Sequence, residues 1–171
     1  MRTSNGLRLG LGVAILVIVF DQATKWWIVE AVMQPPTIIP VTPFFNLVMG
    51  WNRGISFGLF DGDSAVTVWI LPLVALAIVA ALVIWLRRVQ GAWLACAIGL
   101  VIGGALGNVV DRLRFGAVAD FLDFHLAGYH WPAFNVAESG ITVGVTMLVL
   151  DSLFMGAEKP KNKGGTEVKE G

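Results

Sequence analysis

The sequence predicts an all-α membrane protein with four transmembrane helices and a small extracytoplasmic platform of short β-strands. Hydrophobic residues make up 56% of the 171 residues and charged residues only 14%, with a mean hydropathy of +0.75. A soluble domain of this length does not bury so much apolar side chain, so most of the chain is expected to lie in lipid. The apolar runs are each near the ~20 residues that a helix needs to cross a bilayer.

The positions of Lys and Arg predict how these helices are oriented. Cations gather near the two termini and in the turn after the second apolar run, at Arg2, Arg8, Arg87, Arg88, Lys159, Lys161, Lys163 and Lys169. The positive-inside rule therefore places both termini in the cytoplasm. Residues 34–63 and 118–140, which are too polar or broken to span, then both lie on the outer face.

The first predicted span covers about residues 7–29 and ends beside Trp26 and Trp27, a pair typical of a membrane interface. Asp21 and Lys25 are four residues apart and share one face of this helix. A charge at that depth needs a partner. We therefore expect a structural ion pair between the two side chains, rather than a catalytic role for Asp21.

The connector at 34–63 is expected to form short strands against the membrane surface. Its first part contains four prolines, which exclude a helix, and many aliphatic and aromatic residues, which suit strands. Asn52 offers a donor and an acceptor, and Gly54 permits close approach of another backbone. One interpretation of this stretch is a β-turn that binds no ligand. A platform that holds substrate is at least as well supported, because the surrounding residues are apolar.

The second and third spans are predicted at about 66–86 and 93–110. In the third, Gly99, Gly103 and Gly107 recur every four residues and form a stripe that lets helices approach closely in lipid. The end of this helix carries Asn108, Asp111 and Arg112 on one face. They are interpreted as a capping and anchoring cluster, which is compatible with a role in a site.

The fourth span is predicted at about 134–154. Residues 1–156 are expected to form a single integral-membrane domain. The remaining residues, 157–171, are polar, charged and rich in glycine, and predict a disordered cytoplasmic tail.

Acidic residues on the outer face are the candidate catalytic groups. Two carboxyl groups held close together cannot both ionise cheaply, so one keeps its proton and the other can act as a base. Such a pair can activate water and protonate a leaving amine, which is peptide hydrolysis without a metal. Asp111, Asp120, Asp123 and Glu138 all lie on this face. Asp120 follows the third span and Glu138 begins the fourth, which makes them the natural pair if those helices pack together.

Other interpretations compete for some of these residues. Asn135 and Glu138 fit the N-cap and N3 positions of a capping box equally well. Asp123, His125 and His130 lack the spacing of a recognised helical metal site, so we expect an interfacial loop role and no metal. The formal net charge is +0, so the sequence has no excess of positive charge that would indicate nucleic-acid binding. A transport path is disfavoured because the ionisable residues gather at the outer edge, apart from Asp151.

Five segments together resemble a known family. They are DQATK at 21–25, NRGISF at 52–57, GGALGNVVDR at 103–112, VADF at 118–121 and FNVAES at 134–139. In this order they are similar to the lipoprotein signal peptidases (signal peptidase II). The resemblance covers nearly the whole chain except the tail, and the combination is highly specific although no single segment is.

The resemblance implies a four-helix aspartic peptidase of the bacterial inner membrane. Such an enzyme removes the signal peptide of prolipoproteins just before a cysteine that carries diacylglycerol, and it uses no cofactor. The family's first catalytic aspartate matches Asp120, and its outer β-cradle matches the predicted platform. Binding of the cyclic peptide antibiotic globomycin is expected. The residues that line or support the family's site match Asp21, Lys25, Asn52, Gly54, Asn108, Asp111, Arg112 and Asn135.

One residue departs from the family pattern. Glu138 stands where the family has its second catalytic aspartate, so the carboxylate is kept but lies one methylene further from the backbone. A misplacement of ~1 Å can lower a rate by ~100-fold. The surviving carboxylate and the otherwise intact motifs favour retained but reduced activity. The alternative is a weakened or inactive homologue that binds lipoprotein precursors.

Overall fold

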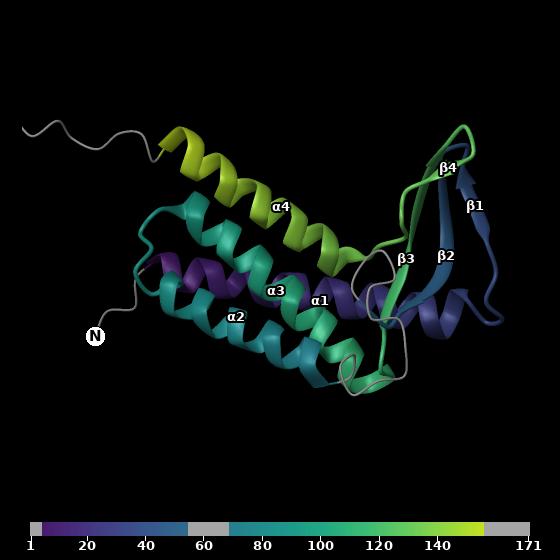
Figure 1. Cartoon of the computed structure of the whole chain (residues 1–171), viewed down its shortest axis with the longest axis horizontal. Helices are drawn as coiled ribbons and strands as arrows, with labels where there is room; N and C mark the ends of the chain where they lie inside the picture. Colours follow the sequence, from purple (N-terminus) through teal and green to yellow (C-terminus); the bar gives the residue numbers. More distant parts are fainter. Residues whose placement is uncertain (1–4, 55–68, 156–171) are drawn as a thin grey trace, which may run out of the picture.

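The computed structural model describes residues 5–54 and 69–155. Four α-helices run alongside one another, and a small antiparallel sheet stands at one end of them (Figure 1). The coarse prediction of a mostly helical membrane protein with a small β-platform is therefore confirmed. The predicted tail at 157–171, the start of the second span at 66–68 and the end of the outer connector lie outside the described residues.

Three described helical segments are long and apolar enough to cross a membrane. Helix α1 (Asn5–Trp27) continues as a π-helical segment to Val32, α3 covers Ala92–Phe115, and α4 (Val136–Leu150) continues through the π-helical turn Asp151–Met155. Helix α2 (Leu71–Leu86) is apolar too, but its described part has only 16 residues. The described residues thus show three candidate spans.

Helix α3 is longer than the sequence predicts. It continues past Val110 to Phe115 and ends at Gly116, whose φ of 70° is left-handed and whose N–H donates to Arg112 O. Of the three residues predicted at the helix end, Arg112 does lie in the last turn, whereas Asn108 and Asp111 lie before it. Their polarity does not signal a helix end because these side chains turn inward, where partners on other elements meet them.

The glycine stripe of α3 packs directly against its neighbours, as predicted. A Cβ atom on Gly103 would lie 2.7 Å from Ala14 O on α1, and one on Gly99 would clash with Gly10 O. On another face, Gly104 of α3 lies against Ala137 O of α4. Helix α3 therefore holds α1 and α4 at close backbone distance.

The sheet has the strand order β1 (Ile39–Thr42), β2 (Phe45–Asn52), β3 (Val118–Leu126) and β4 (Tyr129–His130), and all pairs are antiparallel. Strands β1 and β2 confirm the prediction for the described part of the outer connector. The pairing of β2 with β3 is not foreseen by the sequence. It joins the two segments that were predicted to lie on the outer face into one sheet, and it places Gly50 opposite Asp120.

Candidate active site

The two predicted catalytic residues come from different elements that meet where the sheet joins the helices. Asp120 lies on β3, and Glu138 lies in the first turn of α4. A backbone bridge fixes their relative position, because Phe134 N donates to Leu122 O and Phe134 O accepts from Leu122 N. The start of α4 is therefore fastened to the strand that carries Asp120.

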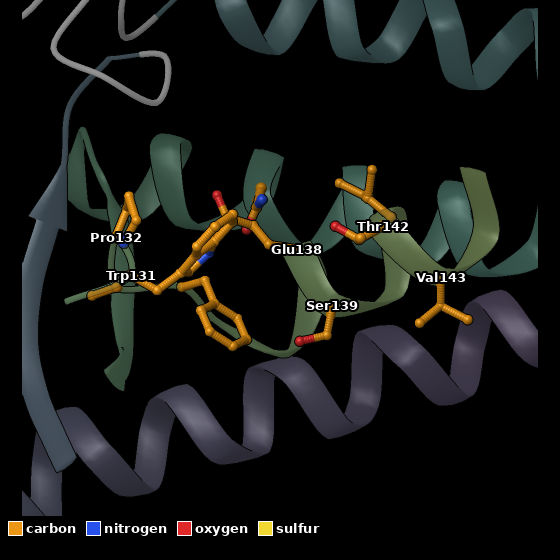
Figure 2. A pocket seen from close by; sticks show the side chains of 10 residues that line it. Trp131, Pro132, Glu138, Ser139, Thr142 and Val143 are labelled. Atoms are coloured by element: carbon orange, nitrogen blue, oxygen red, sulfur yellow. The ribbon is translucent and has the colours of Figure 1, made fainter. Parts of the chain in front are cut away.

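Asn135 contacts both halves of the pair. It is the N-cap of α4, is fully buried, and accepts the Glu138 N–H at 2.8 Å through Oδ1. Its Nδ2 donates to Asp120 Oδ1 at 2.6 Å. The capping role of Asn135 is confirmed, and it does not remove Glu138 from the site. The backbone of Glu138 is capped while its side chain lines a pocket (Figure 2).

Asp120 is buried, with 4% of its surface exposed. This burial raises the pKa of its carboxyl group to about 6, although hydrogen bonds from Asn52 and Asn135 and the charges of Lys25 and Arg112 act in the opposite direction. Its charge also interacts with that of Glu138. A carboxyl group with this pKa can both hold and release a proton near neutral pH, which is what general acid–base chemistry needs.

A buried network of charged and polar groups lies beside the pair. Lys25 Nζ is 2.9 Å from Asp21 Oδ2, which confirms the predicted ion pair, and 2.8 Å from Asp111 Oδ2. It also donates to Asn108 Oδ1 at 3.0 Å. One ammonium group thus joins α1 to two side chains of α3. Burying these charges is tolerable because each is paired and hydrogen-bonded.

Arg112 connects this network to the residues at the end of β2. Its Nη2 donates to Gly54 O at 3.3 Å, and Gly54 N donates to Asn52 Oδ1 at 3.2 Å. The guanidinium charge interacts with Glu138, Asp120 and Asp111. Its Nε is buried without a hydrogen-bond partner in the part of the chain that the structure describes. Arg112 therefore offers an unused donor close to the acidic pair.

An apolar pocket of about 570 Å³ opens beside Glu138. Trp131 and Pro132 lie on one side of Glu138, and Thr142 and Val143 lie on the other (Figure 2). The pocket can hold an apolar chain next to Glu138. Its lining residues are Asn108, Trp131, Pro132, Ala133, Phe134, Glu138, Ser139, Ile141, Thr142 and Val143.

Asp123 belongs to a separate cluster on the sheet. Its carboxylate is 2.8 Å from His130 Nδ1 and accepts from Asn46 Nδ2 at 2.8 Å. Desolvation opposes ionisation, but these bonds and the His130 and His125 rings lower the pKa of Asp123 overall. Among residues 5–54 and 69–155, no group of three His, Cys, Asp or Glu side chains could hold a metal ion.

Sequence reasoning missed Gln22. Its Nε2 donates to Asp111 Oδ1 at 2.9 Å, to Asp21 Oδ2 at 3.1 Å and to Gly107 O at 3.2 Å. The one feature that the sequence offered, an amide inside an apolar span next to Asp21, is too weak to indicate a site residue. The pocket residues Trp131 and Thr142 were also missed. Their only signal was a position in or just after the acid-bearing stretch 118–140.

Comparison with known families gives one consistent match. Residues 13–154 match the family described as signal peptidase (SPase) II. A lipoprotein signal peptidase of Paraburkholderia phytofirmans is 51% identical over 146 residues, which cover 84% of this chain and 83% of that protein. One from Ralstonia nicotianae is 45% identical over 152 residues, covering 87% and 86%.

Solved structures agree with this match. The chain superimposes on a bacterial membrane enzyme with a TM-score of 0.79 and 31% identity, covering 99% of both chains. A second bacterial membrane enzyme gives a TM-score of 0.76 at 30% identity and covers 90% of this chain and 98% of its own.

Proposed function

The chain belongs to the signal peptidase II family of aspartic peptidases, and on this premise we propose that Asp120 and Glu138 are its catalytic pair. The observation that carries the proposal is Asn135, which bonds the Asp120 carboxylate and the Glu138 backbone at once. The interaction between the two carboxyl charges and the pocket that begins at Glu138 support it.

The reaction follows from a pair that shares one proton. The ionised carboxylate removes a proton from a water molecule, which attacks the scissile carbonyl carbon. The protonated carboxyl group then supplies the proton that the leaving amine needs. Because the two carboxyl groups interact, they titrate as a pair. The raised pKa of Asp120 allows proton transfer to and from the pair near neutral pH.

The substrate of this enzyme is a lipoprotein precursor, and we place the cut just before its diacylglyceryl-modified cysteine. The apolar pocket beside Glu138 supports this, since an acyl chain or the apolar part of a signal peptide fits its lining. No metal or cofactor enters the proposed reaction. Globomycin is expected to bind at the same site and to compete with the precursor.

The proposed setting is the bacterial inner membrane, with four spans, both termini in the cytoplasm and the site on the outer face. Three described helices have the length and hydropathy of spans. Helix α2 supports a fourth, because it is apolar and returns alongside α3 in the opposite direction (Figure 1). The Lys and Arg pattern supplies the orientation.

Retained activity is favoured over a binding-only homologue. Glu138 still lines the pocket, and its charge still interacts with those of Asp120, Lys25 and Arg112. The extra methylene therefore has not removed the carboxyl group from the site. We expect cleavage at a rate below that of relatives with aspartate at this position.

Replacing the Asp120 carboxyl group tests the proposal. We expect Asp120→Asn to lower cleavage of a diacylglyceryl-modified prolipoprotein by about 10³-fold, because one acid–base group is lost. The thermal unfolding midpoint in detergent and the binding of globomycin should stay close to those of the unaltered chain. A variant that cleaves normally would exclude Asp120 from catalysis, and a variant that fails to fold would give it a structural role.

A further inference from the structure

Two buried acids outside the catalytic pair each bind the backbone immediately before one of its members. Asp111 Oδ2 accepts the N–H of Ala119, which precedes Asp120, at 3.2 Å. Asp21 Oδ1 accepts the N–H of Ala137, which precedes Glu138, at 2.9 Å. Both acids are fully buried. The two catalytic positions are thus held in the same way from two different helices.

The same two acids are joined to each other by two shared donors. Lys25 Nζ lies 2.9 Å from Asp21 Oδ2 and 2.8 Å from Asp111 Oδ2. Gln22 Nε2 lies 3.1 Å from Asp21 Oδ2 and 2.9 Å from Asp111 Oδ1. A continuous chain of contacts therefore runs from the backbone beside Asp120 to the backbone beside Glu138.

We infer that Gln22 and Lys25 are positioning residues that set the separation of Asp120 and Glu138 by holding Asp21 and Asp111 together. These four residues, Gln22, Lys25, Asp21 and Asp111, are called the clamp below. The inference rests on the proposed catalytic pair. It assigns to Gln22 a role that neither its type nor its place in an apolar helix indicates.

The start of α4 needs such an external contact. The first N–H groups of a helix have no partner within the helix. Asn135 satisfies the N–H of Glu138, and Asp21, from another helix, satisfies that of Ala137. The position of Glu138 relative to α1 therefore depends on Asp21, and the orientation of Asp21 depends on Lys25 and Gln22.

The clamp has little room to rearrange. A Cβ atom on Gly107 would lie 2.5 Å from Asp21 Oδ2, so the backbone of α3 packs closely against this carboxylate. Gln22 also donates to Gly107 O at 3.2 Å, which fixes the amide against the same turn of α3. The acids can keep both backbone contacts only while their shared donors hold them in place.

The separation of two acids has a measurable consequence. Strong coupling moves the two apparent pKa values of a pair apart, and activity that needs one shared proton then follows a broad bell-shaped pH profile. When the two carboxyl groups move apart, their coupling weakens, the two apparent pKa values come closer together, and the bell-shaped pH profile becomes narrower. The charged groups that act on the pair are Asp21 and Lys25 from α1 and Arg112 from α3, and Asp111 acts in turn on Arg112. A test of separation must leave all four unchanged.

Gln22→Met meets this condition, because it removes the amide donors and changes neither the formal charge nor the approximate length of the side chain. We expect kcat on a diacylglyceryl-modified prolipoprotein to fall about 10-fold, with KM within about twofold of the unaltered chain. The pH profile of kcat should become narrower. We expect the shorter amide of Gln22→Asn to reach only one carboxylate, so the kcat of this variant should lie between those of Gln22→Met and the unaltered chain.

Thr24→Val is the matched control on the same helix. Thr24 Oγ1 donates only to backbone oxygens of its own helix, Phe20 O at 2.8 Å and Asp21 O at 2.9 Å, among its described bonds. This variant loses side-chain hydrogen bonds close to the site, one of them to the backbone oxygen of Asp21, but it keeps every side-chain contact of the clamp. Its kcat and the width of its pH profile should equal those of the unaltered chain.

The outcomes separate the inference from the function on which it rests. A narrower profile for Gln22→Met with an unchanged Thr24→Val profile supports the clamp. A Gln22→Met enzyme with a reduced rate but an unchanged profile width overturns it, since loss of folded protein scales the whole profile equally. Normal cleavage by Gln22→Met also overturns it. Absence of cleavage by the unaltered chain at any pH overturns the proposed function itself.

Discussion

At the scale of single residues, the site depends on side chains that make two contacts at once. Asn135 is the clearest case, since its oxygen caps α4 and its nitrogen binds Asp120. Both atoms are buried, so no solvent molecule replaces either contact cheaply. One side chain therefore both caps α4 and binds the proposed catalytic carboxyl group of Asp120, so the capping and catalytic interpretations of Glu138 are compatible.

Substitution of Asn135 separates these two contacts. Asn135→Ala should lower the free energy of unfolding by about 1–3 kcal/mol and reduce cleavage, because a cap and a buried hydrogen bond are both lost. Asn135→Ser restores a capping oxygen that is too short to support Asp120. It should recover most of the stability but not the rate, as measured by thermal unfolding and kcat. Equal recovery of both would contradict the double role.

The sequence identifies the residues of the site better than their contacts. Acids are conspicuous in an apolar chain, so Asp120, Glu138 and the Asp21–Lys25 pair could all be predicted. The contact between Lys25 and Asp111 could not, because it depends on how α1 packs against α3. Gln22 escaped notice since a neutral amide in a helix carries no distinctive pattern.

At the scale of elements, close helix packing brings the site together. The glycines of α3 let α1 and α4 approach, which places Asp21 next to Gly107 and Ala137 next to Gly104. The regular spacing of Gly99, Gly103 and Gly107 made close packing of α3 predictable, but Gly104, which meets α4, lies outside that stripe. The third strand was not predictable in the same way, since β3 is defined by its pairing with the distant β2.

Two glycines offer a matched test of this packing. Gly103→Ala should lower the free energy of unfolding by about 1–3 kcal/mol, because the new methyl group would lie 2.7 Å from Ala14 O and from Val17 Cβ. Gly12→Ala adds the same group on α1 where nothing lies within 4 Å, so stability should be unchanged or higher. Thermal unfolding in detergent measures both. Equal destabilisation would contradict close packing as the cause.

At the scale of the whole molecule, the sheet lies at one end of the helices and the turn between α2 and α3 at the other (Figure 1). Asp120 is on a strand of that sheet, and Glu138 is in the first turn of α4. Hydropathy and cation placement predicted this division before any contact was known. The length of α3 was mispredicted because its inward polar residues resemble those of a helix end.

Cysteine labelling in intact cells tests the proposed topology. Cys96 is the only cysteine of the sequence, so a Cys96→Ala background permits single reporters. We expect Tyr129→Cys, on the sheet, to react with a membrane-impermeant thiol reagent added outside. Gln90→Cys, in the turn after α2, should react only after the membrane is permeabilised. Both positions are exposed, and α3 lies between them in the chain, so labelling of both from one side would contradict a span in α3. It would contradict a span in α2 as well, because β2, which precedes α2, is in the same sheet as β3.

The most direct measurement compares cleavage of a diacylglyceryl-modified prolipoprotein by the unaltered chain, Glu138→Asp and Glu138→Gln. Glutamine keeps the size of the side chain and the Asn135 cap but removes the acid. We predict that the unaltered chain and Glu138→Asp both cut, and that Glu138→Gln is slower by about 10³-fold. Cleavage by Glu138→Gln at the unaltered rate, or cleavage by the Asp form alone, would contradict Glu138 as a working member of the pair.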